Sequence, residues 1–228
     1  MKLHDLFFKI NPKGHVLDVG CFGFQQYNTA MRLGLKDIKH SGVDYCEIKG
    51  EIPPGYTFKN ADLNRDPIPF PDDSFDLVVA SHILEHLFRP IDFIGECVRV
   101  CRPGGYLYVE APSERSLLLP GMPFERDSFF SWSFFDDPTH GGRPWTPQSY
   151  HRLSRYYSCE PVEVGYCTSL GNRVLFPFRL LKALLTRDGK LLELSTRGAI
   201  GWASYLVMKK PENIKGKPEF YYYIPQDR

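Results

Sequence analysis

Three aspartates of the sequence stand at or just past the ends of short apolar, β-rich runs, where a carboxylate can meet a bound ligand. Asp18 shares its run with Gly20, which lets the backbone approach a ligand closely and precedes an expected helix N-terminus. Asp44 ends the second run, and a carboxylate there can accept hydrogen bonds from both hydroxyls of a ribose. Asp62, just past the third run, can accept one from an adenine amino group. The three positions suit a ligand that contains a nucleoside.

Alternating β-rich and helical runs must position these side chains. The predicted strands are 15–19, 40–45, 56–60, 74–81, 105–111, 159–170 and 201–210. Helices are expected over 25–35, over apolar positions at steps of three and four from Leu87 to Cys101, over 146–157 behind the N-cap Thr146 and Pro147, and over 174–185. Such alternation predicts a parallel sheet covered by helices, with a ligand site at the carboxyl ends of its strands.

Four segments then identify a family. VLDVGCFG, GVDY, NADLNRDPIPFPDDSFDLVVASHILEH and RVCRPGGYLYVEAP, which together span about residues 15–112, resemble in order the motifs of class I S-adenosylmethionine-dependent methyltransferases. The resemblance implies an α/β, Rossmann-like, doubly wound and mostly parallel seven-stranded sheet with a substrate-loop insertion, whose last strand, 203–209, is antiparallel. It also implies S-adenosyl-L-methionine as the cofactor.

The same resemblance assigns the cofactor site residue by residue. Asp18 and Gly20 are expected at the methionine end, flanked by Ser81 and His82, while Asp44 holds the ribose. The remaining expected cofactor-binding residues are Asp62 and Leu63 at the adenine, and Cys21, Phe22 and Tyr45 as neighbours in the same loops.

One departure from the family concerns the loop after the first strand. Glycines are usual at the positions of Phe22 and Phe24, whereas this chain has its glycine between them, at Gly23. A phenylalanine there narrows the space beside the cofactor. The departure motivates a rival hypothesis, in which the chain is a binding or regulatory module that keeps the pocket and has lost catalysis.

A second resemblance concerns the acceptor. Residues 137–147 (DPTHGGRPWTP) are similar to a stretch of methyltransferases that modify sugars and polysaccharides, so we expect O-methylation of a small or carbohydrate-like acceptor. Transfer to a neutral hydroxyl needs a base, and we predict His140 first and His86 second. Trp132 and Trp145 are expected to stack on the acceptor and Arg143 to pair with an anionic group. N- or C-methylation of another small molecule is the alternative, with His140 dispensable.

Each histidine also has a structural interpretation. His140 is as well explained as a brace bonded to Asp136 or Asp137, and His86 more often caps a helix. His82 and His86 match the H-x-x-E-H zinc spacing, but that motif needs a continuous helix, and Pro90 follows almost at once. The sequence offers no convincing third ligand, so we expect no metal. Cys97 and Cys101 are expected in the core.

Composition sets the remaining expectations. The 228 residues fit one methyltransferase domain, 1–210, containing a lid or substrate loop over 111–145 and a helical insertion over 170–200, followed by a tail, 211–228. The formal net charge of +1 argues against a nucleic acid partner, and no signal peptide or membrane span is expected, so we predict a cytoplasmic protein with reduced cysteines. The apolar stretch 174–185 is expected to pack on the domain, with a membrane-surface role or a homodimer contact as alternatives.

Overall fold

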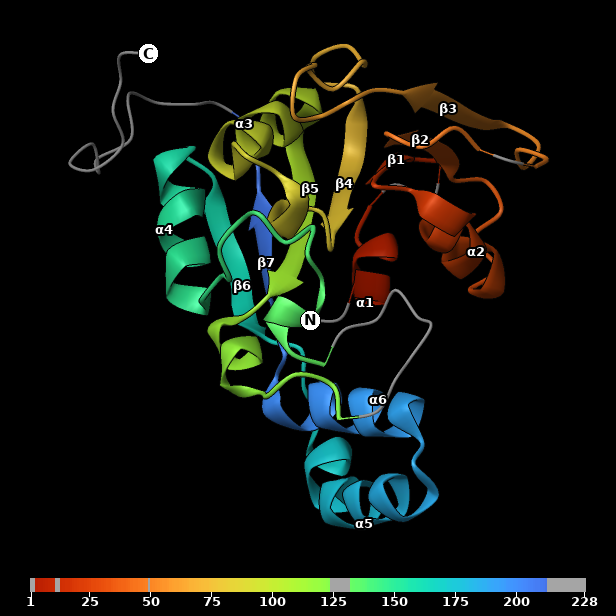
Figure 1. Cartoon of the computed structure of the whole chain (residues 1–228). Coiled ribbons are helices and arrows are strands. Elements are labelled where there is room, and N and C mark those ends of the chain that lie inside the picture. The colour runs from red at the N-terminus through yellow and green to blue at the C-terminus, as the bar shows by residue number, and fades with distance from the viewer. Residues whose placement is uncertain (1–2, 11–12, 49, 124–131, 213–228) are drawn as a thin grey trace.

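A seven-stranded sheet forms the centre of the computed structural model, which describes residues 3–10, 13–48, 50–123 and 132–212 (Figure 1). The strand order is β3-β2-β1-β4-β5-β7-β6. The strands are β1 (His15–Val19), β2 (Lys39–Asp44), β3 (Tyr56–Asn60), β4 (Phe75–Ser81), β5 (Cys101–Pro112), β6 (Glu160–Tyr166) and β7 (Ala203–Lys209). Strands β3 to β5 pair in parallel through β2, β1 and β4, while β7 is antiparallel to both neighbours. The predicted fold, with an antiparallel last strand, is therefore confirmed.

The helices follow the predicted positions, except that the short first helix was not predicted and that two further differences occur. They are α1 (Leu3–Phe7), α2 (Gln25–Arg32), α3 (Pro90–Val100), α4 (Pro147–Tyr156), α5 (Leu170–Thr186) and α6 (Gly189–Ile200). The Thr146 side chain caps α4 by accepting from the Ser149 amide at 3.0 Å, as the sequence predicts. Leu87 has an extended backbone directly after a short 3-10 turn, and it does not belong to α3. The chain also reverses after α5, at Arg187 in the left-handed region, and Asp188 caps a separate α6.

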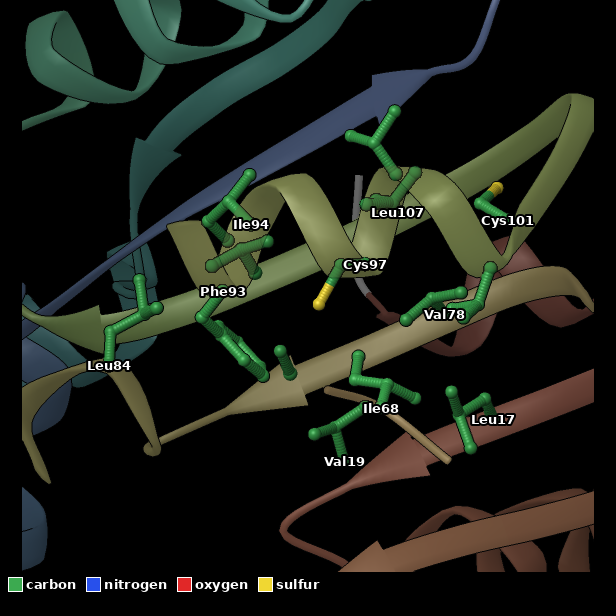
Figure 2. Packing of buried hydrophobic residues seen from close by; sticks show 14 of the residues in the cluster. Leu17, Val19, Ile68, Val78, Leu84, Phe93, Ile94, Cys97, Cys101 and Leu107 are labelled. Atoms are coloured by element: carbon green, nitrogen blue, oxygen red, sulfur yellow. The ribbon is translucent and has the colours of Figure 1, made fainter. Parts of the chain in front are cut away.

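The apolar face of α3 covers one side of the sheet (Figure 2). Ile94 and Cys97 are fully buried against residues of β1, β4 and β5, among them Leu17, Val78 and Leu107. Each large apolar side chain buried in this way stabilises the fold by roughly 1.5–3 kcal/mol. The core placement predicted for Cys97 and Cys101 is confirmed, since both side chains are fully buried.

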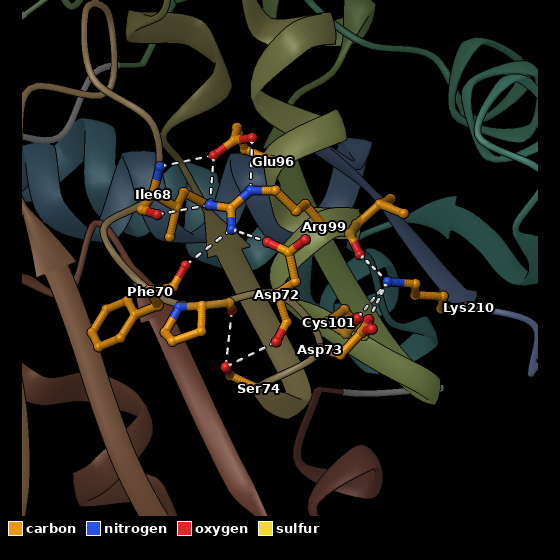
Figure 3. A network of polar contacts seen from close by, with 11 residues as sticks. Ile68, Phe70, Asp72, Asp73, Ser74, Glu96, Arg99, Cys101 and Lys210 are labelled. Atoms are coloured by element: carbon orange, nitrogen blue, oxygen red, sulfur yellow. Dashed lines mark hydrogen bonds and ion pairs between the residues drawn. The ribbon is translucent and has the colours of Figure 1, made fainter.

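A polar network anchors the segment between β3 and β4 to α3 (Figure 3). The Arg99 guanidinium donates to Glu96, to Asp72, and to the backbone oxygens of Ile68 and Phe70, at 2.6–3.0 Å. Charge-assisted bonds of this kind are shorter and stronger than neutral ones. Since the anchored segment follows directly after the loop that carries Asp62, the network holds one wall of the candidate site in place.

Two expected segments lie partly outside the described residues. Within the loop 111–145, the structure describes two short 3-10 turns, Glu114–Leu118 and Phe134–Asp136, with residues 124–131 undescribed. Of the tail 211–228, residues 213–228 are undescribed. No helix in the described ranges is long and apolar enough to cross a membrane.

Candidate active site

A cavity of about 470 Å³ opens at the carboxyl ends of β1, β2 and β4. Most of the residues predicted to bind the cofactor line it, namely Gly20, Phe22, Asp44, Tyr45, Asp62, Leu63 and His82. Five further residues complete the lining: Ala61, Asn64, Ile83, His86 and Leu87. The convergence follows from the topology, because the carboxyl ends of neighbouring parallel strands meet at one edge of the sheet.

The glycine turn after β1 leaves the cavity open despite its two phenylalanines. Gly20 has φ +77°, a left-handed conformation that side chains rarely adopt, and its amide donates to the Val43 carbonyl at 2.9 Å. Phe24 is itself left-handed, and its ring packs edge-on against Tyr56, with the centroids 4.9 Å apart. Phe22 is 75% exposed at the rim of the cavity. The narrowing expected from these rings therefore does not close the site.

Three predicted cofactor residues stand behind the cavity wall. Asp18 is buried, and its carboxylate accepts from the Gln26 amide at the start of α2 at 3.4 Å. Burial raises the pKa of this carboxyl to about 7, against the opposing effect of that hydrogen bond. Cys21 is buried with a thiol pKa raised to about 12 by desolvation, and Ser81 is half-buried at the end of β4. None of these three residues lines the cavity.

Two carboxylates at the β2 and β3 side of the cavity are held by their own loops. Asp44 Oδ1 accepts from the Cys46 amide at 2.9 Å, and Asp62 Oδ1 accepts from the Asn64 amide at 3.1 Å. Asp62 Oδ2 also lies 3.4 Å from Arg65 Nε. Hydrogen bonds from backbone amides fix each carboxylate and leave it the capacity to accept from a ligand, as the predicted ribose and adenine contacts require.

His82 forms the β4 side of the cavity as part of an ionic cluster. Its Nδ1 lies 3.2 Å from Glu85 Oε1 and its Nε2 lies 3.1 Å from Glu110 Oε1. Burial opposes a charge on the ring, but the hydrogen bonds with Glu110 and Glu85 outweigh it and raise the pKa of His82 to about 10. His82 is therefore a cation at neutral pH, and it donates from both nitrogens.

His86 lines the cavity beside His82 and is oriented by the loop that precedes α4. Its Nδ1 lies 2.9 Å from the Thr139 hydroxyl, and that hydroxyl donates to Asp137 Oδ1 at 2.6 Å. Because the Thr139 hydroxyl spends its one hydrogen on Asp137, it must accept from His86 Nδ1–H. The lone pair of neutral His86 is then on Nε2.

His140 lies against His86 but does not line the cavity. Its side chain is 5% exposed, its ring centroid is 5.0 Å from that of His86, and its Nδ1 donates to the Phe134 carbonyl at 2.7 Å. Its Nε2 lies 3.6 Å from Asp137 Oδ2. The His140 ring is thus hydrogen-bonded to the Phe134 carbonyl, and not to Asp136 or Asp137 as in the alternative described above. Because His140 does not line the cavity, His86 is the better placed of the two candidate bases.

The residues predicted to bind the acceptor fall into different environments. Trp145 is completely buried and stacked on Tyr150, with the ring centroids 5.3 Å apart. The prediction that Trp145 stacks on an acceptor is therefore wrong, because its ring is not accessible. Arg143 is exposed, with its guanidinium 4.6 Å from the Trp145 ring. Trp132 is half-buried, and its carbonyl accepts from Trp202 Nε1 at 2.7 Å.

The H-x-x-E-H spacing does not form a peptidase-type zinc site. His82 has φ +55° and precedes the short 3-10 turn Leu84–His86, so its ring and that of His86 do not project one turn apart from a continuous helix. His82 is engaged instead with its two glutamates.

Comparison with known proteins shows which family the cavity-lining part of the chain is similar to. Residues 17–109, which supply the cavity lining described above, match the family described as "Methyltransferase domain". These residues are therefore similar to a methyltransferase domain. The similarity implies S-adenosyl-L-methionine as the cofactor.

Two curated relatives and one solved structure illustrate the similarity. A phthiotriol/phenolphthiotriol dimycocerosates methyltransferase of Mycobacterium ulcerans is 40% identical over 74 residues, which cover 31% of this chain and 25% of the relative. A fatty-acid O-methyltransferase of Mycolicibacterium smegmatis is 35% identical over 105 residues, 42% of this chain and 36% of the relative. The chain thus spans between a quarter and about a third of these relatives. A methyltransferase structure from Archaeoglobus fulgidus shares the fold with a TM-score of 0.57, 20% identity and 86% coverage of both chains.

The cavity fits S-adenosyl-L-methionine by the chemistry of its donors and acceptors. Asp44 and Asp62 offer carboxylates for a ribose diol and an adenine amino group, and the turn at Gly20 brings backbone to the cavity. Asp18 is not part of the cavity lining, and its carboxyl is mainly ionised only above its pKa of about 7.

The sequence analysis missed two residues of the site. Asn64 bridges two walls, because its side chain accepts from the Phe88 amide at 2.8 Å and donates to the His86 carbonyl at 3.4 Å. Thr139 joins the site only through long-range packing of its loop. The one sequence signal that could have identified Asn64 is its place two residues after Asp62, just past the end of a strand.

Proposed function

We propose that the protein transfers the methyl group of S-adenosyl-L-methionine to a hydroxyl oxygen of an acceptor with a long apolar part. The observation that carries the proposal is His86, a cavity-lining imidazole with Nδ1–H committed to the Thr139–Asp137 pair and a lone pair on Nε2. When bound, the cofactor supplies an electrophilic methyl group on a sulfonium. His86 would take up, at Nε2, the proton that the acceptor hydroxyl loses when it receives the methyl group.

The order of the strands separates the nucleoside-binding end of the cavity from the end at which the methyl acceptor approaches. Asp44 and Asp62 follow β2 and β3, whereas His82 and His86 follow β4, with β1 between these strands. The nucleoside is then held at one end and the methyl acceptor approaches at the other. His86 orients the acceptor hydroxyl there, and the Asp137 carboxylate favours the imidazolium that forms.

The apolar part of the acceptor is inferred from the surface beside the His82 end. α5 and α6 lie beyond the carboxyl ends of β4 and β5, with α5 outermost (Figure 1). Phe178 and Leu185 of α5 are 72% and 76% exposed. The chain returns from α6 through Trp202, whose ring centroid is 6.0 Å from that of His82. The similarity to a phthiotriol/phenolphthiotriol dimycocerosates methyltransferase and to a fatty-acid O-methyltransferase supports the same class of acceptor.

A carbohydrate-like acceptor, predicted from residues 137–147, is the second candidate. Arg143 favours it, because its exposed guanidinium can meet an anionic sugar. The burial of Trp145 removes one of the stacking surfaces that such an acceptor would use.

Labelled methyl transfer to a matched acceptor panel tests the proposal. The panel contains a long-chain alkyl phenol, a long-chain fatty acid, and neutral and acidic hexose oligosaccharides. We expect the alkyl phenol to be methylated on oxygen at least about tenfold faster than any oligosaccharide, since burial of apolar chain contributes about 0.8 kcal/mol per methylene. Faster methylation of an oligosaccharide would reject the apolar acceptor in favour of the second candidate. Transfer to none of them would contradict the proposal.

A further inference from the structure

The cluster of Glu85, His86 and His140 has the composition and spacing of a metal site. One carboxylate oxygen of Glu85 and one ring nitrogen of each histidine all lie within 4.8 Å of one another. Two imidazoles and one carboxylate are a donor set that divalent transition metals prefer, whereas Mg²⁺ prefers oxygen alone. The sequence offered no third ligand for His86, and the structure supplies one from a loop more than fifty residues away, since the Thr139 contact spans 53 positions.

Both histidines are oriented as metal ligands usually are. His86 donates through Nδ1 to the Thr139 hydroxyl, which is bonded to Asp137, and His140 donates through Nδ1 to the Phe134 carbonyl. An outer hydrogen bond of this kind fixes the tautomer and ring orientation of a ligating histidine. Each ring therefore keeps its lone pair on Nε2, the nitrogen free to ligate.

Two carboxylates lie near this cluster. Glu85 is 2% exposed, and within the described residues its Oε2 is buried without a hydrogen-bond partner, while Oε1 faces His82. Asp137 Oδ2 lies 3.6 Å from His140 Nε2, which is too long for a hydrogen bond. Two ligands with bonds of ~2.1 Å to one tetrahedral ion are about 3.4 Å apart. A cation bound by Glu85 and the two histidines would give the buried Glu85 oxygen the partner that it lacks.

The turn that carries Glu85 and His86 packs closely against the loop that carries His140. The Gly142 amide donates to the Glu85 carbonyl at 2.9 Å. A side-chain carbon at Gly142 would meet the Leu84 carbonyl oxygen at 2.9 Å and that of Glu85 at 3.1 Å. The glycine thus permits the contact that brings His140 to His86.

We propose that Glu85, His86 and His140 bind a divalent transition-metal ion such as Zn²⁺. The expected effect of the ion on methyl transfer rests on the proposed function. A bound ion would occupy the lone pair with which His86 accepts the hydroxyl proton. Metal-loaded protein is therefore expected to bind S-adenosyl-L-methionine and to lose methyl transfer to hydroxyls, until a chelator restores it.

Calorimetric titration of chelator-treated full-length protein with ZnCl₂ tests the site without cofactor or acceptor. We expect one saturable site, weakened at least about 100-fold in His140→Ala, since loss of outer partners alone costs 10- to 100-fold. His151→Ala, which removes an exposed histidine of α4, and Cys46→Ser, which removes an exposed thiol, are the matched controls and should bind zinc as wild type does. Glu85→Gln keeps the shape of the buried side chain and should also weaken binding.

Three results would overturn the proposal: no saturable zinc binding, equal zinc affinity in His140→Ala and His151→Ala, or loss of binding in Cys46→Ser. Methyl transfer by the chelator-treated protein is measured separately. Transfer without zinc binding would reject the metal site and keep the proposed function, whereas zinc binding without transfer to any acceptor would do the reverse.

Discussion

Replacing His86 by alanine is expected to lower the rate of methyl transfer to a hydroxyl acceptor about 100- to 10,000-fold, the usual contribution of a positioned base. The reason is geometric: His86 lines the cavity and presents Nε2, with Nδ1 bound through Thr139 to Asp137. Steady-state rates at saturating cofactor measure the effect. Transfer to a carboxylate, which has no proton to lose, should fall far less in the same variant.

Two further variants define the role of His86. His151→Ala, on the exposed side of α4, should keep the wild-type rate. Thr139→Val removes the hydroxyl that orients the imidazole and should lower the rate for hydroxyl acceptors by a smaller factor. Cofactor affinity within a few-fold of wild type would show that the cavity is intact. A His86→Ala protein that methylates hydroxyls at the wild-type rate would contradict the assignment.

Replacing Asp18 by asparagine is expected to stabilise the unliganded protein at pH 8. Burial raises the pKa of this carboxyl to about 7 in the folded state, against 3.8 as the ordinary value. The folded protein therefore binds a proton that the unfolded chain releases, so ionised Asp18 destabilises the fold progressively as pH rises from about 4 to 7. The shift corresponds to a cost of the order of 4 kcal/mol above pH 7.

Thermal unfolding of both proteins at pH 5 and pH 8 measures this effect. The amide does not titrate, so the gain in stability of Asp18→Asn over wild type should be larger at pH 8 than at pH 5 by a few kcal/mol, or roughly 10 °C in midpoint. A gain that does not change with pH would contradict the raised pKa. Wild-type affinity for the cationic cofactor should also rise with pH across 7, and the affinity of Asp18→Asn should stay flat.

The strand-end aspartates could be predicted because their signal is local. A short apolar run followed by an acid and a turn residue gives β1, β2 and β3 with their carboxylates, and parallel pairing then brings Asp44 and Asp62 to one edge. The antiparallel β7 came from the family resemblance and was confirmed by its pairing with β5 and β6. Local sequence patterns, together with the rule that the carboxyl ends of parallel strands meet at one edge of the sheet, were sufficient to predict these strands and their aspartates.

The acceptor side depends on packing between distant segments. From the sequence we predicted that Trp145 is an accessible aromatic residue of a loop. Its ring is instead buried against Tyr150 of α4. The rank of the two histidines changed for the same reason, since burial separates His140 from the cavity while His86 lines it. The division between α5 and α6 had a local signal, Asp188 before Gly189, which an N-cap explains.

The central claim is that the cavity at the ends of β1, β2 and β4 is the S-adenosyl-L-methionine site, and calorimetric titration with the cofactor and with S-adenosylhomocysteine tests it most directly. We expect saturable one-to-one binding to the wild type and to Asp37→Ala, which removes an exposed aspartate outside the cavity. Asp44→Ala should weaken binding about 100-fold or more, because hydrogen bonds to a charged group contribute about 1.5–3 kcal/mol each. Equal affinity of Asp44→Ala and Asp37→Ala, or no binding to the wild type, would contradict the account.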